Sequence, residues 1–157
     1  MTPLLLTDPT GDDHGLGYGY PRAALFAEGG FADLTGFQAL NRGEKLVLRV
    51  RLSRYPNAAD APNGFSLATV AIYLHDKEGG AEALPGAGFK TPKGLGWNRA
   101  YLLTGWKAEE RFPGGASKAV RVQKSGDWLG GSPDLPPGDY QYYVATGLHD
   151  PFTPWYF

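Results

Sequence analysis

The clearest pattern along the chain is a strict alternation of side chains in Lys45–Leu52 (KLVLRVRL). One set of alternate positions holds only leucine and valine, while the other holds one lysine, two arginines and one valine. A period of two is typical of a β-strand that buries one face. We therefore expect a strand here whose leucines face a core and whose basic side chains form a solvated face.

A second apolar run, Ser66–His75 (SLATVAIYLH), lies between two glycine-containing turn sequences. It also predicts a strand, because such a run is short, rich in branched residues and bounded by turn signals. We expect three alternate residues to face the core and the other three to lie opposite, namely Val70, Ile72 and Leu74 against Ala71, Tyr73 and His75.

Further strands are predicted by aromatic and β-branched enrichment between turn signals. The stronger ones are Trp97–Thr104, Lys118–Gln123 and Tyr140–Leu148, and the weaker ones are Leu4–Thr7, Phe37–Leu40 and Ala81–Leu84. Two segments are predicted loops, Arg54–Pro62 and Gly105–Gly115, and Trp128–Leu129 belongs to a short segment before a loop.

Helical periodicity is weak throughout, and only Ala23–Glu28 suggests a single turn. With about eight short strands and no alternation of strands with helices, antiparallel pairing is favoured. The 157 residues suit one domain, and we find no boundary or internal repeat. We predict an all-β fold over residues 1–157, an antiparallel, jelly-roll-like β-sandwich of two packed sheets.

The overall charge argues against a nucleic-acid partner. Lysine and arginine number 15 and aspartate and glutamate 16, so the formal charge is −1 and no basic surplus is present. No uncharged apolar run approaches the roughly 20 residues of a membrane span. The start, MTPLLLTDP, lacks the basic region and the apolar core of about 7–15 residues of a signal peptide. We therefore expect either a protein that stays inside the cell or a chain without its export signal.

The sequence offers little for catalysis. Cysteine is absent, which excludes disulfides, thiolate metal sites and a cysteine nucleophile. The three histidines, His14, His75 and His149, do not show metal-ligand spacing, and no nucleophile elbow or phosphate-binding loop occurs. We predict a protein that is not an enzyme. Two carboxylates facing across a cleft, as in a glycosidase, stay open as an alternative.

The densest motif is DPTGDDHGLGYGYP, residues 8–21. It places the three carboxylates of Asp8, Asp12 and Asp13 among glycines that let the backbone turn toward one point. Calcium prefers six to eight oxygen ligands of this kind, so the motif is a candidate calcium site, although its spacing is not that of an EF-hand. The alternative is that Asp8 and Asp12 cap turns through hydrogen bonds to the backbone.

Four aromatic residues are candidates for stacking on a sugar ring. Tyr18 and Tyr20 alternate with glycine, and Trp97 and Trp106 flank a predicted strand. Indole and phenol rings offer an electron-rich face to the C–H groups of a pyranose. The alternatives are that the tyrosines pack under a long loop and that the tryptophans belong to the core or cover an edge.

Several stretches together resemble the C-terminal domain family of glucodextranase, a domain also appended to amylopullulanases and related starch-processing enzymes. In order along the chain they are DPTGDDHGLGYGYP, FADLTGFQAL, PNGFSLATVAIYL, LPGAGF, GWNRAYLLTGW and LGGSPDLPPGDYQYYVATGLHDPF. The resemblance implies a β-sandwich similar to family 9 carbohydrate-binding modules. It also implies a non-catalytic role, calcium sites and a position usually outside the cell.

Two departures from the family pattern bear on function. The family tends to carry aspartates where this chain has Ala71 and His75, so a metal or ligand site there is expected to be weakened or lost. We also expect a domain that stands alone, without a catalytic partner domain. The leading hypothesis is a carbohydrate-binding module for α-glucan-type saccharides. The alternatives are a structural or protein-interaction sandwich, stabilised by calcium, and a small hydrolase.

Overall fold

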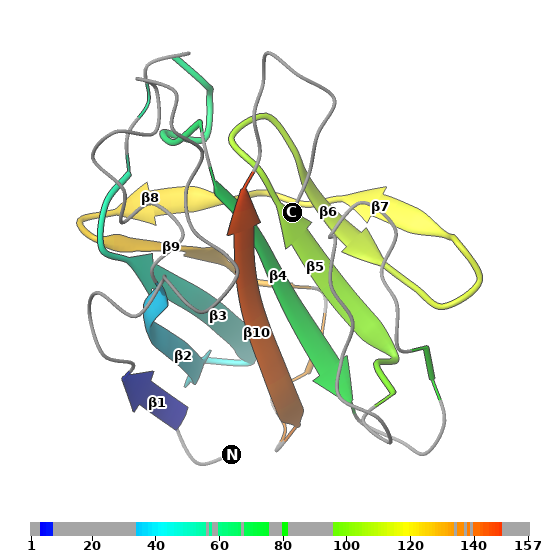
Figure 1. Cartoon of the computed structure of the whole chain (residues 1–157). Helices are drawn as coiled ribbons and strands as arrows, with labels where there is room; N and C mark the ends of the chain where they lie inside the picture. Colours follow the sequence, from blue (N-terminus) through cyan, green and yellow to red (C-terminus); the bar gives the residue numbers. More distant parts are fainter. Residues whose placement is uncertain are drawn as a thin grey trace, which may run out of the picture.

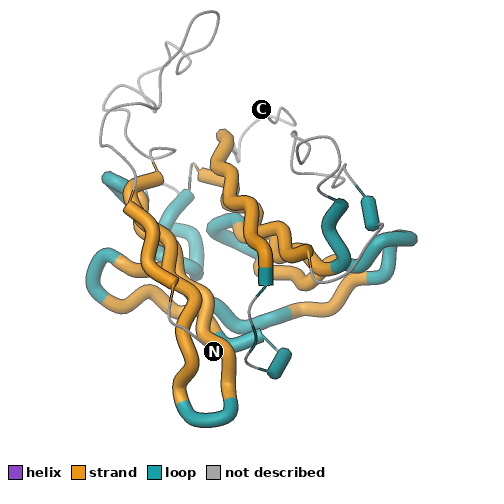
Figure 2. Tube along the Cα trace, turned by 90° about the horizontal axis from the view of Figure 1, so that it is seen from below, coloured by secondary structure: helices purple, strands orange, loops and turns teal. Residues whose placement is uncertain are grey.

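The structure is a computed structural model that describes residues 4–7, 34–55, 57, 60–66, 68–75, 80–81, 96–133, 135–136, 138 and 140–148. Within these residues it has ten β-strands. The described part of the chain is drawn as strands and loops without a helix (Figures 1 and 2). The strands form two five-stranded sheets in which every neighbouring pair is antiparallel. The predicted all-β antiparallel sandwich is confirmed.

The two sheets have different strand orders. The first sheet runs β1 (Leu4–Thr7), β2 (Leu34–Arg42), β3 (Lys45–Leu52), β9 (Trp128–Gly131) and β8 (Gln123–Ser125). The second runs β10 (Gln141–Leu148), β4 (Ala68–His75), β5 (Arg99–Leu103), β6 (Ala108–Arg111) and β7 (Ser117–Ala119). The chain therefore crosses between the sheets after β3, after β7 and after β9.

The core lies between the sheets and follows the predicted alternation. The leucines and the valine of one face of β3 are buried, as expected. They meet inward residues of the second sheet, and the rings of Phe37 on β2 and Tyr142 on β10 join the two sheets at a centroid distance of 5.1 Å. The buried residues of this core are Phe37, Ala39, Leu46, Leu48, Val50, Leu52, Phe65, Ala68, Val70, Ile72, Tyr101, Leu103 and Leu129.

The opposite face of β4 is also buried. A second apolar cluster there consists of Ala71, Tyr73, Trp97, Ala100 and Leu102. Because β4 is covered on both faces, its sequence is almost continuously apolar instead of alternating.

Three of the predictions need correction, one of them a stronger strand prediction. The predicted loop Gly105–Gly115 contains β6, which pairs with both β5 and β7. The single strand predicted over Lys118–Gln123 is interrupted, because the chain leaves β7 at Ala119 and enters the other sheet at Gln123. Trp128–Leu129 begins strand β9 instead of preceding a loop. Of the weak strand Ala81–Leu84, only Ala81 lies within the described residues, and it forms an isolated bridge with Trp97.

Candidate functional site

Trp106 lies in the turn between β5 and β6, and 37% of its surface is exposed. It is one of the two large hydrophobic side chains that are exposed in the described part of the chain, and the other is Leu5. A half-exposed indole is amphipathic and is a common contact residue at binding surfaces. Of the predicted stacking residues that the structure describes, Trp106 is the one that reaches the surface.

The turn that carries Trp106 is fixed by hydrogen bonds on both sides. The hydroxyl of Thr104 accepts from the backbone N–H of Trp106 at 3.3 Å and from that of Lys107 at 3.1 Å. Asn63 reaches the same turn from another segment, donating from its backbone to the carbonyl of Gly105 and from its side-chain Nδ2 to that of Thr104, both at 2.9 Å. The backbone that positions the indole is therefore held from two separate parts of the chain.

The same turn has no room for a side chain at position 105, which is occupied by glycine. A Cβ added there would lie 1.9 Å from the carbonyl oxygen of Phe65 and 2.7 Å from the Cβ of Ala61. Phe65 is a core residue, 1% exposed, so its backbone has little room to yield. Glycine is thus required here for the close approach of two backbone segments.

The structure corrects the expectation that Trp97 stacks on a sugar. Trp97 is only 2% exposed and packs against Tyr73, with ring centroids 6.3 Å apart. Its backbone exchanges two hydrogen bonds with Ala81, at 3.1 and 2.8 Å. Because other residues cover its ring, Trp97 is a core tryptophan, which was the alternative considered from the sequence. Trp97 and Trp106 therefore do not form a pair on one exposed face.

The other predicted site residues are not described. Asp8, Asp12, Asp13, Tyr18 and Tyr20 all lie outside the described residues. Among the residues that are described, no group of three or more His, Cys, Asp or Glu side chains is arranged to hold a metal ion. The calcium site at the three aspartates therefore stays a prediction.

Ala71 and His75, the two positions at which the resemblance leads us to expect aspartate in the family, are both engaged in packing or polar contacts. Ala71 is completely buried in the second apolar cluster. The Nδ1 of His75 contacts the carbonyl oxygen of Gly96, which requires the proton on that nitrogen. Neither side chain can supply a carboxylate ligand to a metal ion.

Sequence reasoning missed an aromatic and basic surface on the first sheet. Trp128 on β9 has two guanidinium groups over its ring, those of Arg49 at 5.2 Å and Arg51 at 5.0 Å from the centroid. An open depression of about 820 Å³ beside Trp128 is lined by residues of β3, β8 and β9 and by the segment before β8. The alternation in β3 predicts a basic face on this strand. From the sequence alone, however, its arginines indicate only a solvated face and no binding surface.

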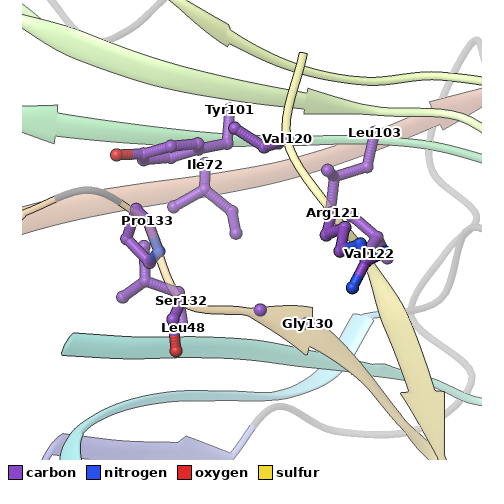
Figure 3. Close-up of a pocket in the computed structure, with 11 residues that line it drawn as sticks. Leu48, Ile72, Tyr101, Leu103, Val120, Arg121, Val122, Gly130, Ser132 and Pro133 are labelled. Carbon is purple, nitrogen blue, oxygen red and sulfur yellow. The ribbon is translucent and has the colours of Figure 1, made fainter. Parts of the chain in front are cut away.

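The cavity between the sheets does not have the size of a saccharide site. It measures about 30 Å³ and is mainly apolar. Ile72 and Tyr101 line it from the second sheet, Leu48 from the first, and the 120–122 crossover closes one side (Figure 3). A space of this size accommodates about one water molecule. This cavity is therefore too small for a saccharide, and among the described residues the candidates for sugar contact lie on the surface of the sandwich.

Comparison with known proteins identifies the family. The sequence profile of the C-terminal binding-module, SLH-like, of glucodextranase matches residues 4–147. No curated protein matches the chain significantly. Among the described residues, no helix is long and apolar enough to cross a membrane. Since the match extends over nearly the whole chain and the sandwich fits the resemblance, this protein belongs to the family of the SLH-like C-terminal binding module of glucodextranase.

Proposed function

We propose that this protein is a non-catalytic carbohydrate-binding module for α-glucan-type saccharides, with Trp106 as a sugar-stacking residue. The family is one of binding modules, which supports a binding role. The observation that carries the proposal is the 37% exposure of Trp106 on a turn fixed by Thr104, Asn63 and Gly105. A fixed aromatic ring loses little conformational entropy when a ligand binds, so more of the stacking energy appears as affinity.

Two neighbouring carboxylates of the second sheet, those of Glu109 and Glu110, are not arranged as a catalytic pair. A glycosidase needs two carboxyl groups facing each other across the scissile bond. Glu109 and Glu110 are neighbours on β6 and therefore point to opposite faces of the sheet. Glu109 pairs with Arg111 at 2.6 Å, while Glu110 is buried and pairs with Arg99 at 3.4 Å. Both carboxylates are thus engaged by arginine, on opposite sides of one strand.

A titration with neutral α-glucans tests the proposal directly. We expect maltooligosaccharides or pullulan to shift and quench the intrinsic tryptophan fluorescence to saturation, because a sugar on an exposed indole changes its environment. Trp106→Ala should lower the affinity at least about tenfold, the equivalent of one lost stacking contact. Trp106→Phe keeps an aromatic face and should retain part of the affinity.

Trp97→Phe serves as the matched control, since it also removes one indole but from a buried position. We expect it to leave the glucan affinity unchanged, apart from any loss of folded protein, which a thermal unfolding curve would report. If wild type shows no saturable response to any α-glucan, the stacking proposal is wrong. Equal loss of affinity in Trp106→Ala and Trp97→Phe would also reject Trp106 as the specific contact.

The alternative is a structural or protein-interaction sandwich. The burial of Trp97 favours it, because one of the predicted stacking aromatics has a packing role. In this case a flat glucan response would be accompanied by a partner that binds a sheet face or edge. The carbohydrate proposal also includes Tyr18 and Tyr20 as additional stacking residues, and Asp8, Asp12 and Asp13 as calcium ligands.

A further inference from the structure

We propose that the outer face of the first sheet is a second binding surface, which takes an anionic, carboxylate-bearing polysaccharide. This face is formed by β2, β3, β9 and β8, which lie side by side in Figure 1. It is separate from Trp106, which belongs to a turn of the second sheet. The inference therefore does not depend on α-glucan binding at that turn.

Strand register gives the composition of this face. Arg42 on β2 lies opposite Lys45 on β3, Gln38 lies opposite Arg49, and Arg51 lies opposite Trp128 on β9. Since alternate residues of a strand share a face, Lys45, Arg49 and Arg51 project from the same side of β3. The row from Lys45 to Arg51 extends over about 20 Å at the usual rise per residue. It is a linear array of cations, not a single charged point.

The two central arginines are held in place by acceptors on β2. Arg49 donates to the Oε1 of Gln38 from its Nε at 2.9 Å and also from its Nη2. Arg51 donates from its Nε to the hydroxyl of Thr35 at 3.1 Å and from its Nη2 to the backbone carbonyl of Thr35 at 3.3 Å. These acceptors are neutral, so they orient the guanidinium groups without cancelling their charge.

The positive charge of the face is not balanced within the described residues. None of the positions on this face carries aspartate or glutamate. Among the described acidic residues, the two nearest to this face along the chain are Glu44 and Asp127. They lie in the turns at the strand ends, and within the described part of the chain neither forms an ion pair. The whole chain has a formal charge of −1, so this concentration of cations is a local feature.

The depression beside Trp128 adds neutral hydrogen-bonding groups to the charged ones. Arg42, Lys45, Arg49 and Arg121 line it together with Gln123, Ser125 and Ser132. Amide and hydroxyl groups suit the hydroxyls of a sugar, while the arginines suit its carboxylates through paired hydrogen bonds. Trp128 supplies an aromatic side chain in the same depression. A polyuronate chain presents all three kinds of complementary group.

Nucleic acid fits this face less well. Binders of single-stranded nucleic acid use several aromatic side chains in succession to stack bases. Trp128 is the single aromatic residue on the described positions of this face. Donors of the Gln and Ser type, in contrast, match the many hydroxyls of a saccharide. The chemistry therefore favours an acidic polysaccharide.

Affinity electrophoresis and calorimetry with polygalacturonate test this inference. We expect wild type to bind polygalacturonate with an affinity that falls as salt is added, because surface charges are screened. The double variant Arg49→Gln/Arg51→Gln should bind at least about tenfold more weakly, since hydrogen bonds to charged groups are lost. Arg49→Lys/Arg51→Lys keeps the charge and should retain an intermediate affinity.

Lys107→Gln/Lys118→Gln is the matched control, because it removes two positive charges from exposed positions outside this face. We expect it to bind polygalacturonate like wild type. No binding by wild type, equal losses in the two double variants, or binding of a DNA duplex as tight as that of polygalacturonate would overturn the inference. Thermal unfolding of each variant verifies that it is folded.

The α-glucan proposal and the acidic-polysaccharide inference can each be rejected independently of the other. Trp106→Ala should leave polygalacturonate binding unchanged, and Arg49→Gln/Arg51→Gln should leave α-glucan binding unchanged. Loss of the neutral-glucan response alone would reject the proposed function, whereas loss of the polygalacturonate response alone would reject this inference.

Discussion

The carboxylate of Glu110 lies 3.4 Å from the Nη1 of Arg99 across strands β6 and β5, and its side chain is only 3% exposed. Glu110 lies opposite Tyr101 in the register, so it points into the sandwich beside a core residue. A buried carboxylate depends on its partner much more than an exposed one does, because it has no water to replace that partner.

Removal of Arg99 is therefore expected to destabilise the fold. Arg99→Met should lower the free energy of unfolding by about 2–3 kcal/mol, somewhat less than for a fully buried pair because Arg99 is 25% exposed. Glu110→Gln should cost less, since a neutral amide is left in place of an unpaired charge. Urea denaturation of both variants measures the difference, and an Arg99→Met protein at least as stable as Glu110→Gln would contradict it.

Gly105→Ala is expected to disturb the turn that carries Trp106. The added methyl group would meet the carbonyl of Phe65 at 1.9 Å, so one of the two backbone segments has to move. Overpacking of this kind costs about 1–3 kcal/mol. We expect a lower denaturation midpoint and also weaker α-glucan binding, because the indole shifts. Gly114→Ala offers a comparison, since no atom lies within 4 Å of its added Cβ, although its φ of +97° adds strain. Its glucan affinity should stay at the wild-type value.

Stability should fall in alkaline solution. Burial of the hydroxyl raises the pKa of Tyr101, and the nearby Glu110 carboxylate raises it further. Burial likewise raises the pKa of Tyr73. Above about pH 10 the unfolded chain loses these protons while the folded protein keeps them, so the unfolded state is favoured as the pH rises.

Urea denaturation at about pH 8 and pH 11 measures this effect, since the lower value lies below and the upper above the ordinary tyrosine pKa. Tyr101→Phe removes one of the titrating groups and should show a smaller loss of stability between the two pH values. An unchanged loss in Tyr101→Phe would mean that Tyr101 does not contribute to the alkaline transition.

Calcium binding at Asp8, Asp12 and Asp13 is expected to raise the unfolding temperature. With calcium at about one hundred times its Kd, a chelator should lower the midpoint by about 5–10 °C, since a ligand held only by the folded state stabilises it. Asp12→Asn/Asp13→Asn should lower the midpoint in calcium and abolish the effect of the chelator. If wild type melts at the same temperature with and without chelator, the aspartates cap turns instead.

Strands with a regular alternation of apolar and polar residues were predictable from the sequence. Strands that form only because neighbouring strands pair with them were not. Lys45–Leu52 has the predicted bounds because leucine and valine recur at every second position, which only a one-sided strand explains. Strand β6 (AEER) has no such pattern. It becomes a strand because β5 and β7 supply hydrogen-bonding partners on both sides. Tertiary pairing thus decides the structure of a segment whose alanine and glutamate residues do not favour a strand.

The candidate site was predictable only in part for the same reason. Tryptophan at positions 97 and 106 is equally suited to a surface or a core, and sequence does not reveal that the outer face of β4 and β5 is buried around Trp97. The sequence places Trp128 in a short segment before a loop, and its neighbours Gly126, Gly130 and Gly131 give no signal of a strand. The register of β3 with β9 brings it to the arginines, across a long stretch of chain.

That pairing also has a consequence for how the protein folds. Val50 on β3 pairs with Leu129 on β9, and Ala71 on β4 pairs with Ala145 on β10. Each sheet therefore contains a ladder that closes only when a late segment of the chain returns to an early one. Such high contact order slows folding, into the range of about milliseconds to seconds. On the ribosome, the first sheet is complete only when β9 has emerged, and the second only when β10 has emerged. The apolar faces of β3 and β4 therefore lack part of their cover while most of the chain is synthesised.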